Sequence, residues 1–422
     1  MVFRLNMRWL VPALAALALS GLLSGCGGSK GSAAPAPTGG LTVTPGSGKV
    51  TITWNATPGV EYWLVYGAAS SISATPTPTI NHVWIQNVSS PLVVAGLANG
   101  VTYSFAMNGR IDGGPGGAST ASVSAVPRPA GASWIRDTAT AGAQMASTDA
   151  ITGIAYDGVA GFASVSSSGA MYKGQISPGP GISWTAAASP AGTSFRAVAY
   201  RNATDGLVAV GSGGYCQGVD LATPNCTTTA GLNWNAVASA GVQTVMVGDG
   251  GNILHSDSVG GAWAAGTGAS GNLRGVAYVG ANWIAINEAG AVFKSADGAT
   301  WAAATVTGVP GGALRGIASY SSRVVAVGTN GTVMTSADSG LSWTVQTPIE
   351  GAPALNAVNL SYDQILVVAN GGKVFTSPML LTPVWTAVPS SATHTTSDLL
   401  AVFGSSSLYF SVGSAGTSIY AQ

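Results

Sequence analysis

A sequence motif repeated at nearly constant spacing constrains the fold of this 422-residue chain more than any other feature. It opens at seven positions, at intervals of 44, 39, 39, 41, 41 and 44 residues: Ile151, Phe195, Trp234, Leu273, Leu314, Leu355 and Leu399. In the most regular copy, short apolar strands cover residues 314–319, 323–328 and 332–336, and a fourth begins near Trp343. A period of about 40 residues with about four strands per unit is the pattern of β-propeller blades. The sequence therefore predicts an all-β protein with a seven-bladed β-propeller over residues 132–422.

The segment between the third and fourth strands of that copy contains a turn motif. Residues 336–343 read SADSGLSW, and residues 295–301 read SADGATW one repeat earlier. They resemble the Asp box, S-x-D-x-G-x-x-W, of the sialidase-type BNR-repeat propellers. In such a turn Ser and Asp oxygens accept backbone N–H groups, Gly supplies a positive φ, and Trp fills the gap between blades. We expect this structural role for Ser295, Asp297, Trp301, Ser336, Asp338, Gly340 and Trp343.

Calcium or sugar binding by Asp297 and Asp338 is the alternative to that structural role. Calcium takes about six to eight oxygen ligands, and no second carboxylate stands beside either residue in the sequence. The sequence therefore predicts neither a bound metal nor a cofactor.

The two ends of the repeat region predict how the ring closes. The seventh copy stops after its third strand, near residues 417–421, and lacks a fourth. Residues 133–137 stand alone before the first copy and contain Trp134, in the position of the Trp that opens other fourth strands. We expect this segment to complete the last blade, because pairing the first and last strands in one sheet removes an open edge.

Strand order also predicts which side chains share a face. The turns between second and third strands lie on the same rim as the connections between blades, here called the upper rim. Polar residues recur there, at the second position of the first strands and in these turns: Arg196, Asn235, Asp249, Arg274, Glu288, Arg315, Asn330 and Asn356. One hypothesis is a polar collar at the channel mouth that binds an anionic or carboxylate-bearing group. The alternative is that each Arg pairs with a neighbouring acidic turn and only seals the channel.

The N-terminus has the pattern of an export signal over residues 1–25. Arg4 and Arg8 precede an apolar run at residues 9–23, which is short for a membrane span. Residues 23–26 read LSGC and resemble the lipobox of bacterial lipoproteins. The resemblance implies cleavage before Cys26 and acylation of that residue, and Gly27 in place of an Asp favours the outer membrane, on its periplasmic or outer face. An ordinary signal peptide with an incidental Cys is the alternative. Residues 26–40, rich in Gly, Ser, Ala and Pro, are expected to be a flexible tether.

Residues 41–128 form a second predicted all-β domain, with short strands and turn signals about every ten residues. Residues 49–54 alternate polar and apolar side chains and end on Trp54, and residues 97–103 read LANGVTY. These features resemble a fibronectin type III domain. The resemblance implies a corner in which the Tyr103 hydroxyl bonds to the preceding backbone, and places Trp54, Leu97 and Tyr103 in the core. A short linker, residues 127–131, would follow.

Cysteine usage and charge exclude some functions. Beyond Cys26 there are two cysteines, Cys216 and Cys226, which are most simply a disulfide in an exported protein. A nucleophilic Cys216 is the alternative. The chain has 15 basic and 15 acidic residues and a formal net charge of zero. It therefore has no polybasic surface for nucleic acid.

The sialidase resemblance implies glycoside hydrolysis with an Arg cluster, a Tyr–Glu nucleophile pair and an Asp acid. Residues 195–196 match the first two letters of the family's Phe-Arg-Ile-Pro opening, but Ile and Pro do not follow. Glu288 and Glu350 are the Glu residues of the repeat region, so Asp249 with Glu288 is a carboxylate pair that stays open. The His residues are scattered and form no metal or nucleophile motif: His82, His255 and His394. We predict no catalytic residues.

The motif pattern of the repeat at residues 273–301 also resembles that of the BNR-type propellers of the photosystem II assembly and stability factor family. That resemblance implies a protein-binding scaffold. Taken together, the sequence predicts a monomeric, non-catalytic lipoprotein, held on a membrane at Cys26, whose propeller binds a protein or glycan partner. The alternative function is a sialidase-like glycoside hydrolase or lectin acting on extracellular carbohydrate.

Overall fold

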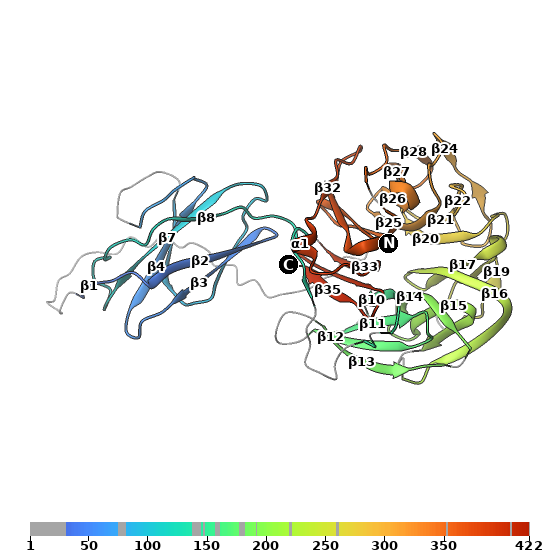
Figure 1. The fold of residues 1–422 in the computed structure, drawn as a ribbon, viewed down its shortest axis with the longest axis horizontal. Helices are drawn as coiled ribbons and strands as arrows, with labels where there is room; N and C mark the ends of the chain where they lie inside the picture. Colours follow the sequence, from blue (N-terminus) through green and yellow to red (C-terminus); the bar gives the residue numbers. More distant parts are fainter. Residues whose placement is uncertain are drawn as a thin grey trace. The chain divides into compact units, whose positions relative to one another are not determined.

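The computed structural model describes residues 31–74, 82–136, 145–146, 148–156, 161–176, 182–190, 192–218, 222–258, 261–351, 353–405 and 407–421. The chain divides into two compact units, which meet in sequence at Pro129 and Ala130 (Figure 1). The predicted signal segment and Cys26 lie outside the described residues. Among the residues described, no helix is both long and apolar enough to cross a bilayer.

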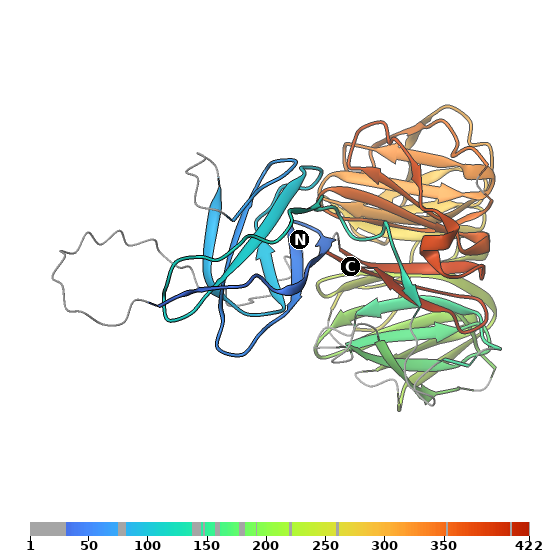
Figure 2. The same cartoon turned by 60° about the vertical axis from the view of Figure 1, so that its left-hand side comes forward.

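The N-terminal unit consists of two facing antiparallel sheets (Figure 2). One contains β2 (Thr38–Gly46), β3 (Lys49–Asn55) and β6 (Leu92–Ala95). The other contains β1 (Ala33–Ala34), β7 (Tyr103–Arg110), β4 (Glu61–Gly67) and β5 (Val83–Val88), with β8 (Val123–Ala125) also paired to β7. Alternating side chains of both sheets, including Ile52, Leu64 and Phe105, form the core between them.

The predicted corner and core residues lie where the sequence placed them. The Tyr103 hydroxyl accepts a hydrogen bond from the Ala98 N–H at 3.2 Å. Trp54 is 7% exposed and meets Tyr62 edge to face. The expected tether, however, is wrong for residues 33–34 and 38–40. β1 pairs with β7 and β2 begins at Thr38, because backbone groups there find partners at a sheet edge.

The C-terminal unit contains six sheets in its described residues, and five of them make one blade each. Their strands, from inside to outside, are as follows. Blade 1 has β10 (Ile151–Tyr156), β11 (Gly161–Ser166), β12 (Met171–Ile176) and β13 (Ile182–Ala188). Blade 4 has β20 (Leu273–Val279), β21 (Asn282–Asn287), β22 (Val292–Ser295) and β23 (Ala302–Ala303). Blade 5 has β25 (Leu314–Tyr320), β26 (Arg323–Gly328), β27 (Val333–Ser336) and β28 (Ser342–Val345), with β24 (Thr305–Thr307) parallel to β28. Blade 6 has β29 (Leu355–Leu360), β30 (Gln364–Ala369), β31 (Val374–Pro378) and β32 (Thr386–Ala387). Blade 7 has β33 (Leu399–Ser405), β34 (Leu408–Gly413), β35 (Ser418–Ala421) and β9 (Ile135–Arg136).

Blades 2 and 3 share one long strand and make up the sixth sheet. Its order is β14 (Ser194–Asn202), β15 (Gly206–Gly218), β16 (Asn225–Ala240), β17 (Gln243–Gly248), β18 (Ile253–Ser256) and β19 (Ala264–Ala265). The first part of β16 pairs with β15, and from Trp234 onwards it pairs with β17 as the inner strand of blade 3. The described residues therefore form seven blades, as the repeat predicts.

The ring closes as predicted. Ile135 and Arg136 of β9 pair with Tyr420 and Ile419 of β35. Trp134, fully buried, packs in a cluster that joins blades 6 and 7. Each inner strand contacts the inner strand of the next blade, and β33 contacts β10, so the inner strands form a closed ring.

Short turns complete the unit. One-turn 3-10 helices join second and third strands in blades 3, 5 and 6: Asp249–Gly251, Thr329–Gly331 and Asn370–Gly372. A four-residue helix, α1 (Ser390–Thr393), lies between blades 6 and 7. These turns and connections make up the upper rim.

Candidate functional site

Every inner strand carries a β-bulge at the position that the sequence singled out. In blade 1, Ile151 pairs with Ser166 and Gly153 with Val165, so Thr152 is left out of the ladder. The same shift occurs in each of the other described blades. The bulged residues are Thr152, Arg196, Asn235, Arg274, Arg315, Asn356 and Leu400. A bulge turns its side chain away from the usual alternation, so these seven positions form a ring of redirected side chains, here called the collar.

Just below the collar, the inner strands come too close for large side chains. A Cβ added to Gly316 would lie 2.9 Å from the Asn356 oxygen, and one on Gly275 would lie 2.7 Å from Ile317. The equivalent residues in all the blades are Gly or Ala: Gly153, Ala197, Ala236, Gly275, Gly316, Ala357 and Ala401. The inner strands of neighbouring blades therefore pack tightly at this level.

Five of the eight predicted binding residues form one continuous polar chain across blades 2 to 4. Arg196 Nη1 donates to Asn235 Oδ1. Asn235 Nδ2 in turn donates to Asp249 Oδ1 at 2.8 Å. Arg274 bridges two carboxylates, with Nη1 at 3.1 Å from Asp249 Oδ1 and Nη2 at 2.6 Å from Glu288 Oε2. Arg274 is therefore neutralised by its neighbours, as the sealing alternative expects.

The two carboxylates of this chain stay ionised. Burial raises the pKa of Asp249, but hydrogen bonds from Asn235 and Asn233 and the charges of Arg274 and Arg196 outweigh burial and bring the pKa below its usual value. For Glu288, hydrogen bonds from Arg274 and Asn272 lower the pKa. Neither group is suited to hold a proton at neutral pH.

A second, separate pair lies on blades 5 and 6. Arg315 Nη1 donates to Asn356 Oδ1 at 2.7 Å, and Asn356 Nδ2 donates to Asn370 Oδ1 at 2.7 Å. Arg315 is exposed. Among the described residues, neither Arg315 nor Arg196 lies within ion-pair distance of a carboxylate. Asn330, the eighth predicted residue, donates to Gly311 O at 3.0 Å, in the connection that precedes β25.

The collar also ties blades together. Thr152 Oγ1 donates to Phe195 O at 2.9 Å, Asn235 Nδ2 to Leu273 O at 2.7 Å, and Asn356 Nδ2 to Leu399 O at 2.8 Å. In each case the acceptor belongs to the residue just before the bulged position of the next inner strand. Part of the collar therefore seals the ring, while Arg196 and Arg315 keep N–H donors beyond these contacts.

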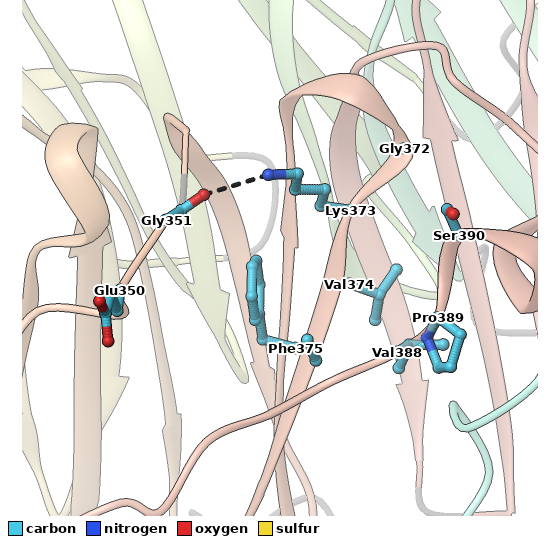
Figure 3. Close-up of a pocket in the computed structure, with 10 residues that line it drawn as sticks. Glu350, Gly351, Gly372, Lys373, Val374, Phe375, Val388, Pro389 and Ser390 are labelled. Carbon is cyan, nitrogen blue, oxygen red and sulfur yellow. Dashed lines mark hydrogen bonds between the residues drawn. The ribbon is translucent and has the colours of Figure 1, made fainter.

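A cavity of about 360 Å³ lies at the upper-rim end of blade 6 (Figure 3). Its lining comes from the connections before and after the blade, from the end of the turn Asn370–Gly372, and from β31 and β32: Glu350, Gly351, Gly372, Lys373, Val374, Phe375, Ala387, Val388, Pro389 and Ser390. Sequence reasoning missed this site. The available signal was Lys373, which directly precedes the third strand, where other blades have Ala170, Asn252, Ala291, Thr332 and Thr417.

The Asp boxes have the geometry expected of structural turns. Asp338 Oδ1 accepts the N–H groups of Leu341 and Ser342 at 3.1 and 3.0 Å, and Ser336 Oγ accepts that of Gly340 at 2.9 Å. Trp343 Nε1 donates to Gly340 O at 3.0 Å. The box of blade 4 repeats the pattern, with Ser295, Asp297 and Trp301 in the same roles. Trp343 packs with Ile284 and Ile286 of blade 4, so the box joins neighbouring blades.

The predicted disulfide is confirmed. Cys216 and Cys226 face each other across β15 and β16 and are bonded, with a Cα–Cα distance of 4.0 Å. This pairing removes the nucleophile alternative for Cys216. Within the described ranges, no group of three or more His, Cys, Asp or Glu side chains is placed to hold a metal ion.

The closed ring of seven blades defines the C-terminal unit as a β-propeller. No protein-family model matches the sequence, and no curated protein sequence matches it either. Among solved structures, YCF48 bound to D1 peptide is similar with a TM-score of 0.52 and 14% identity, over 69% of this chain and 94% of that one. YCF48 from Cyanidioschyzon merolae is similar with a TM-score of 0.51 and 12% identity, over 68% of this chain and 98% of that one. The WD40 β-propeller domain of Doa1 is similar with a TM-score of 0.54 and 10% identity, over 68% of this chain and 96% of that one. At these identities the likeness shows the β-propeller fold alone.

Proposed function

We propose that this protein is a non-catalytic, lipid-anchored scaffold of the cell envelope whose propeller binds another protein on its upper rim. The observation that carries the proposal is the collar, where Arg196 and Arg315 are hydrogen-bonded to amide oxygens and keep N–H donors for a ligand. Guanidinium groups held in this way suit a carboxylate of a partner chain. The YCF48 structure holds a D1 peptide, and this lends support through shared fold only.

The state of the carboxylates argues against the glycosidase alternative. A pair of glycosidase carboxyl groups needs one member that is protonated near neutral pH, which requires a raised pKa. Both Asp249 and Glu288 have a lowered pKa, and both are bonded to Arg274. The pair that the sequence left open is therefore an ion-pair network rather than an acid–base pair.

The envelope location rests on the sequence of residues 23–26, and the N-terminal unit fits a spacer role. Its pairing, β2-β3-β6 in one sheet and β8-β7-β4-β5 in the other, supports a fibronectin type III-like domain. Acylation at Cys26 would hold such a protein on the outer membrane through several chains. Mass spectrometry of the mature N-terminus tests this part, and an unmodified Cys26 would refute it.

Partner capture tests the binding proposal. The acylated protein is cross-linked in detergent-solubilised envelope, and each captured protein is identified and then purified for titration. Replacing Arg196 and Arg315 together with Ala should weaken binding of that protein roughly tenfold or more, since a charge-assisted hydrogen bond contributes about 1.5–3 kcal/mol. Arg323→Ala, at the opposite end of blade 5, is the matched control. Equal affinity of the double variant and the control would discard the collar as the binding site.

Catalysis is tested directly on the same material. Fluorogenic glycosides should show no turnover above buffer. Turnover by the wild-type protein that Glu288→Gln abolishes would overturn the non-catalytic assignment and favour the hydrolase alternative.

A further inference from the structure

The cavity on blade 6 combines an apolar floor with opposite charges at its edge. Phe375, which is 5% exposed, and Ala387, its partner in the neighbouring strand, form the floor, while the side chains of Val374 and Val388 pack on the other face of the blade. Lys373 and Glu350, both exposed, stand at the opening (Figure 3). A volume of about 360 Å³ is near the lower end of the range for ligand sites. It suits one large side chain rather than a cofactor.

The walls of this cavity are held by the blade itself. The Val388 N–H donates to Val374 O at 2.9 Å, and β32 pairs with β31 at Phe375 and Ala387. Across the opening, Lys373 Nζ donates to Gly351 O at 3.1 Å (Figure 3). An ammonium group has three N–H donors, so Lys373 keeps donors for a ligand while this bond fixes its position. The cavity is thus formed before any ligand arrives.

One turn of the chain links the cavity to the second polar pair of the collar. Asn370, which accepts from Asn356, opens the turn Asn370–Gly372, and Lys373 follows that turn directly. Arg315 is bonded to the same Asn356. A partner segment that lies over blades 5 and 6 would therefore reach the cavity from the collar by crossing a single turn of this protein, Asn370–Gly372.

We propose that the cavity is the side-chain pocket of a peptide-binding site, and that its occupant is an extended peptide segment with a large apolar residue between an acidic and a basic one. This inference rests on the proposed function, since it names the kind of segment that the partner would present. In an extended chain, residues at i, i+2 and i+4 face the same side. An Asp-x-Leu-x-Lys pattern would thus place its carboxylate at Lys373, its Leu on the Phe375 floor and its ammonium at Glu350.

A labelled pentapeptide, acetyl-Asp-Thr-Leu-Thr-Lys-amide, tests the proposal by fluorescence anisotropy with the full-length protein. Replacing its Leu by Gly should weaken binding roughly tenfold to a hundredfold, because burying a Leu side chain is worth about that factor. Ala387→Trp, at an exposed position in the lining, should fill the cavity and weaken binding at least tenfold. Lys373→Glu should also weaken peptide binding by about tenfold or more.

The chain offers a matched control for the filling variant. Ala303 is exposed and pairs with Phe293 in blade 4, just as Ala387 pairs with Phe375 in blade 6. Ala303→Trp should leave peptide binding within twofold of wild type. Equal affinity of Ala387→Trp and Ala303→Trp would overturn the pocket, and so would competition by free leucine as strong as that of the unlabelled peptide.

Failure of the pocket and failure of the proposed function are separable outcomes. If the wild-type protein binds no pentapeptide but loses its captured partner in the Arg196 and Arg315 double variant, the pocket is wrong and the collar stands. If neither binding is seen, both proposals are refuted.

Discussion

Trp134 should hold the propeller closed. The strand that it precedes, β9, forms a ladder of two residue pairs with β35. Both residues of β9 are exposed, Ile135 by 49%. Such a short ladder contributes little, whereas Trp134 is fully buried and its Nε1 donates to Gly131 O at 2.8 Å. We therefore expect Trp134→Ala to release the closing strand.

The size of the effect follows from this burial. A Trp side chain buries about 150–250 Å², which at about 25 cal/mol per Å² corresponds to roughly 4–6 kcal/mol. Measured costs of Trp→Ala in protein cores are about 3–5 kcal/mol. Leaving the Gly131 carbonyl without its donor adds to this cost. We expect Trp134→Ala to lower the free energy of unfolding of the propeller by about 4 kcal/mol.

Urea denaturation of the full-length chain, followed by circular dichroism, measures this change. The transition of the N-terminal unit should stay where it is and serves as an internal control. Hydrogen exchange should show faster exchange of the β35 amides in the variant, since that strand becomes an edge. Ile135→Ala should change stability by less than about 0.5 kcal/mol, because Ile135 is already half exposed.

Trp343→Ala supplies the comparison that could refute the reasoning. Trp343 is 1% exposed and donates to Gly340 O, so its loss should cost about 3–5 kcal/mol as well. If Trp343→Ala has that cost while Trp134→Ala changes the free energy of unfolding by less than about 1 kcal/mol, the closing strand is not anchored by Trp134.

Three further predictions concern the Asp box, the inner ring and the disulfide. Burial raises the pKa of Asp338, but hydrogen bonds from Ser342, Ser336 and the Leu341 N–H lower it to about 2. The carboxylate thus stabilises the fold above its unfolded pKa of about 3.9, and this contribution is lost as the pH falls towards 2. After discounting for exposure, denaturation at pH 5 and at pH 2 should differ by about 1 kcal/mol more in wild type than in Asp338→Asn. Gly316→Val should lower the free energy of unfolding by about 1–3 kcal/mol, because its side chain meets the backbone of Asn356; an unchanged thermal midpoint would contradict the tight inner ring. Replacing Cys216 and Cys226 together with Ser should cost about 2–3 kcal/mol in urea denaturation, and a reductant should then have no further effect.

Sequence reasoning reached the site only in part. The collar positions were found because the repeat aligns equivalent residues, and the channel-facing register follows from strand order. Their pairing was not foreseeable, since Arg196 meets Asn235 at a separation of 39 residues and Arg274 bonds to acids of two blades at once. The expected tether was wrong at residues 33–34 and 38–40, because pairing of β1 with β7 and of Thr38 with Asn55 is a long-range contact with no local signal. The cavity beside Lys373 escaped notice for a similar reason, as its lining comes from segments up to 40 residues apart.

The sequence by itself determined the number of blades, the closing segment at Trp134 and the disulfide, because these depend on local periodicity and on counts of repeats and cysteines. The tertiary structure alone decided which arginines are neutralised, how closely the inner strands approach and where an apolar cavity opens on the rim. Those features depend on the angle and spacing between neighbouring blades. Packing of whole sheets sets that geometry, and no single stretch of the chain encodes it.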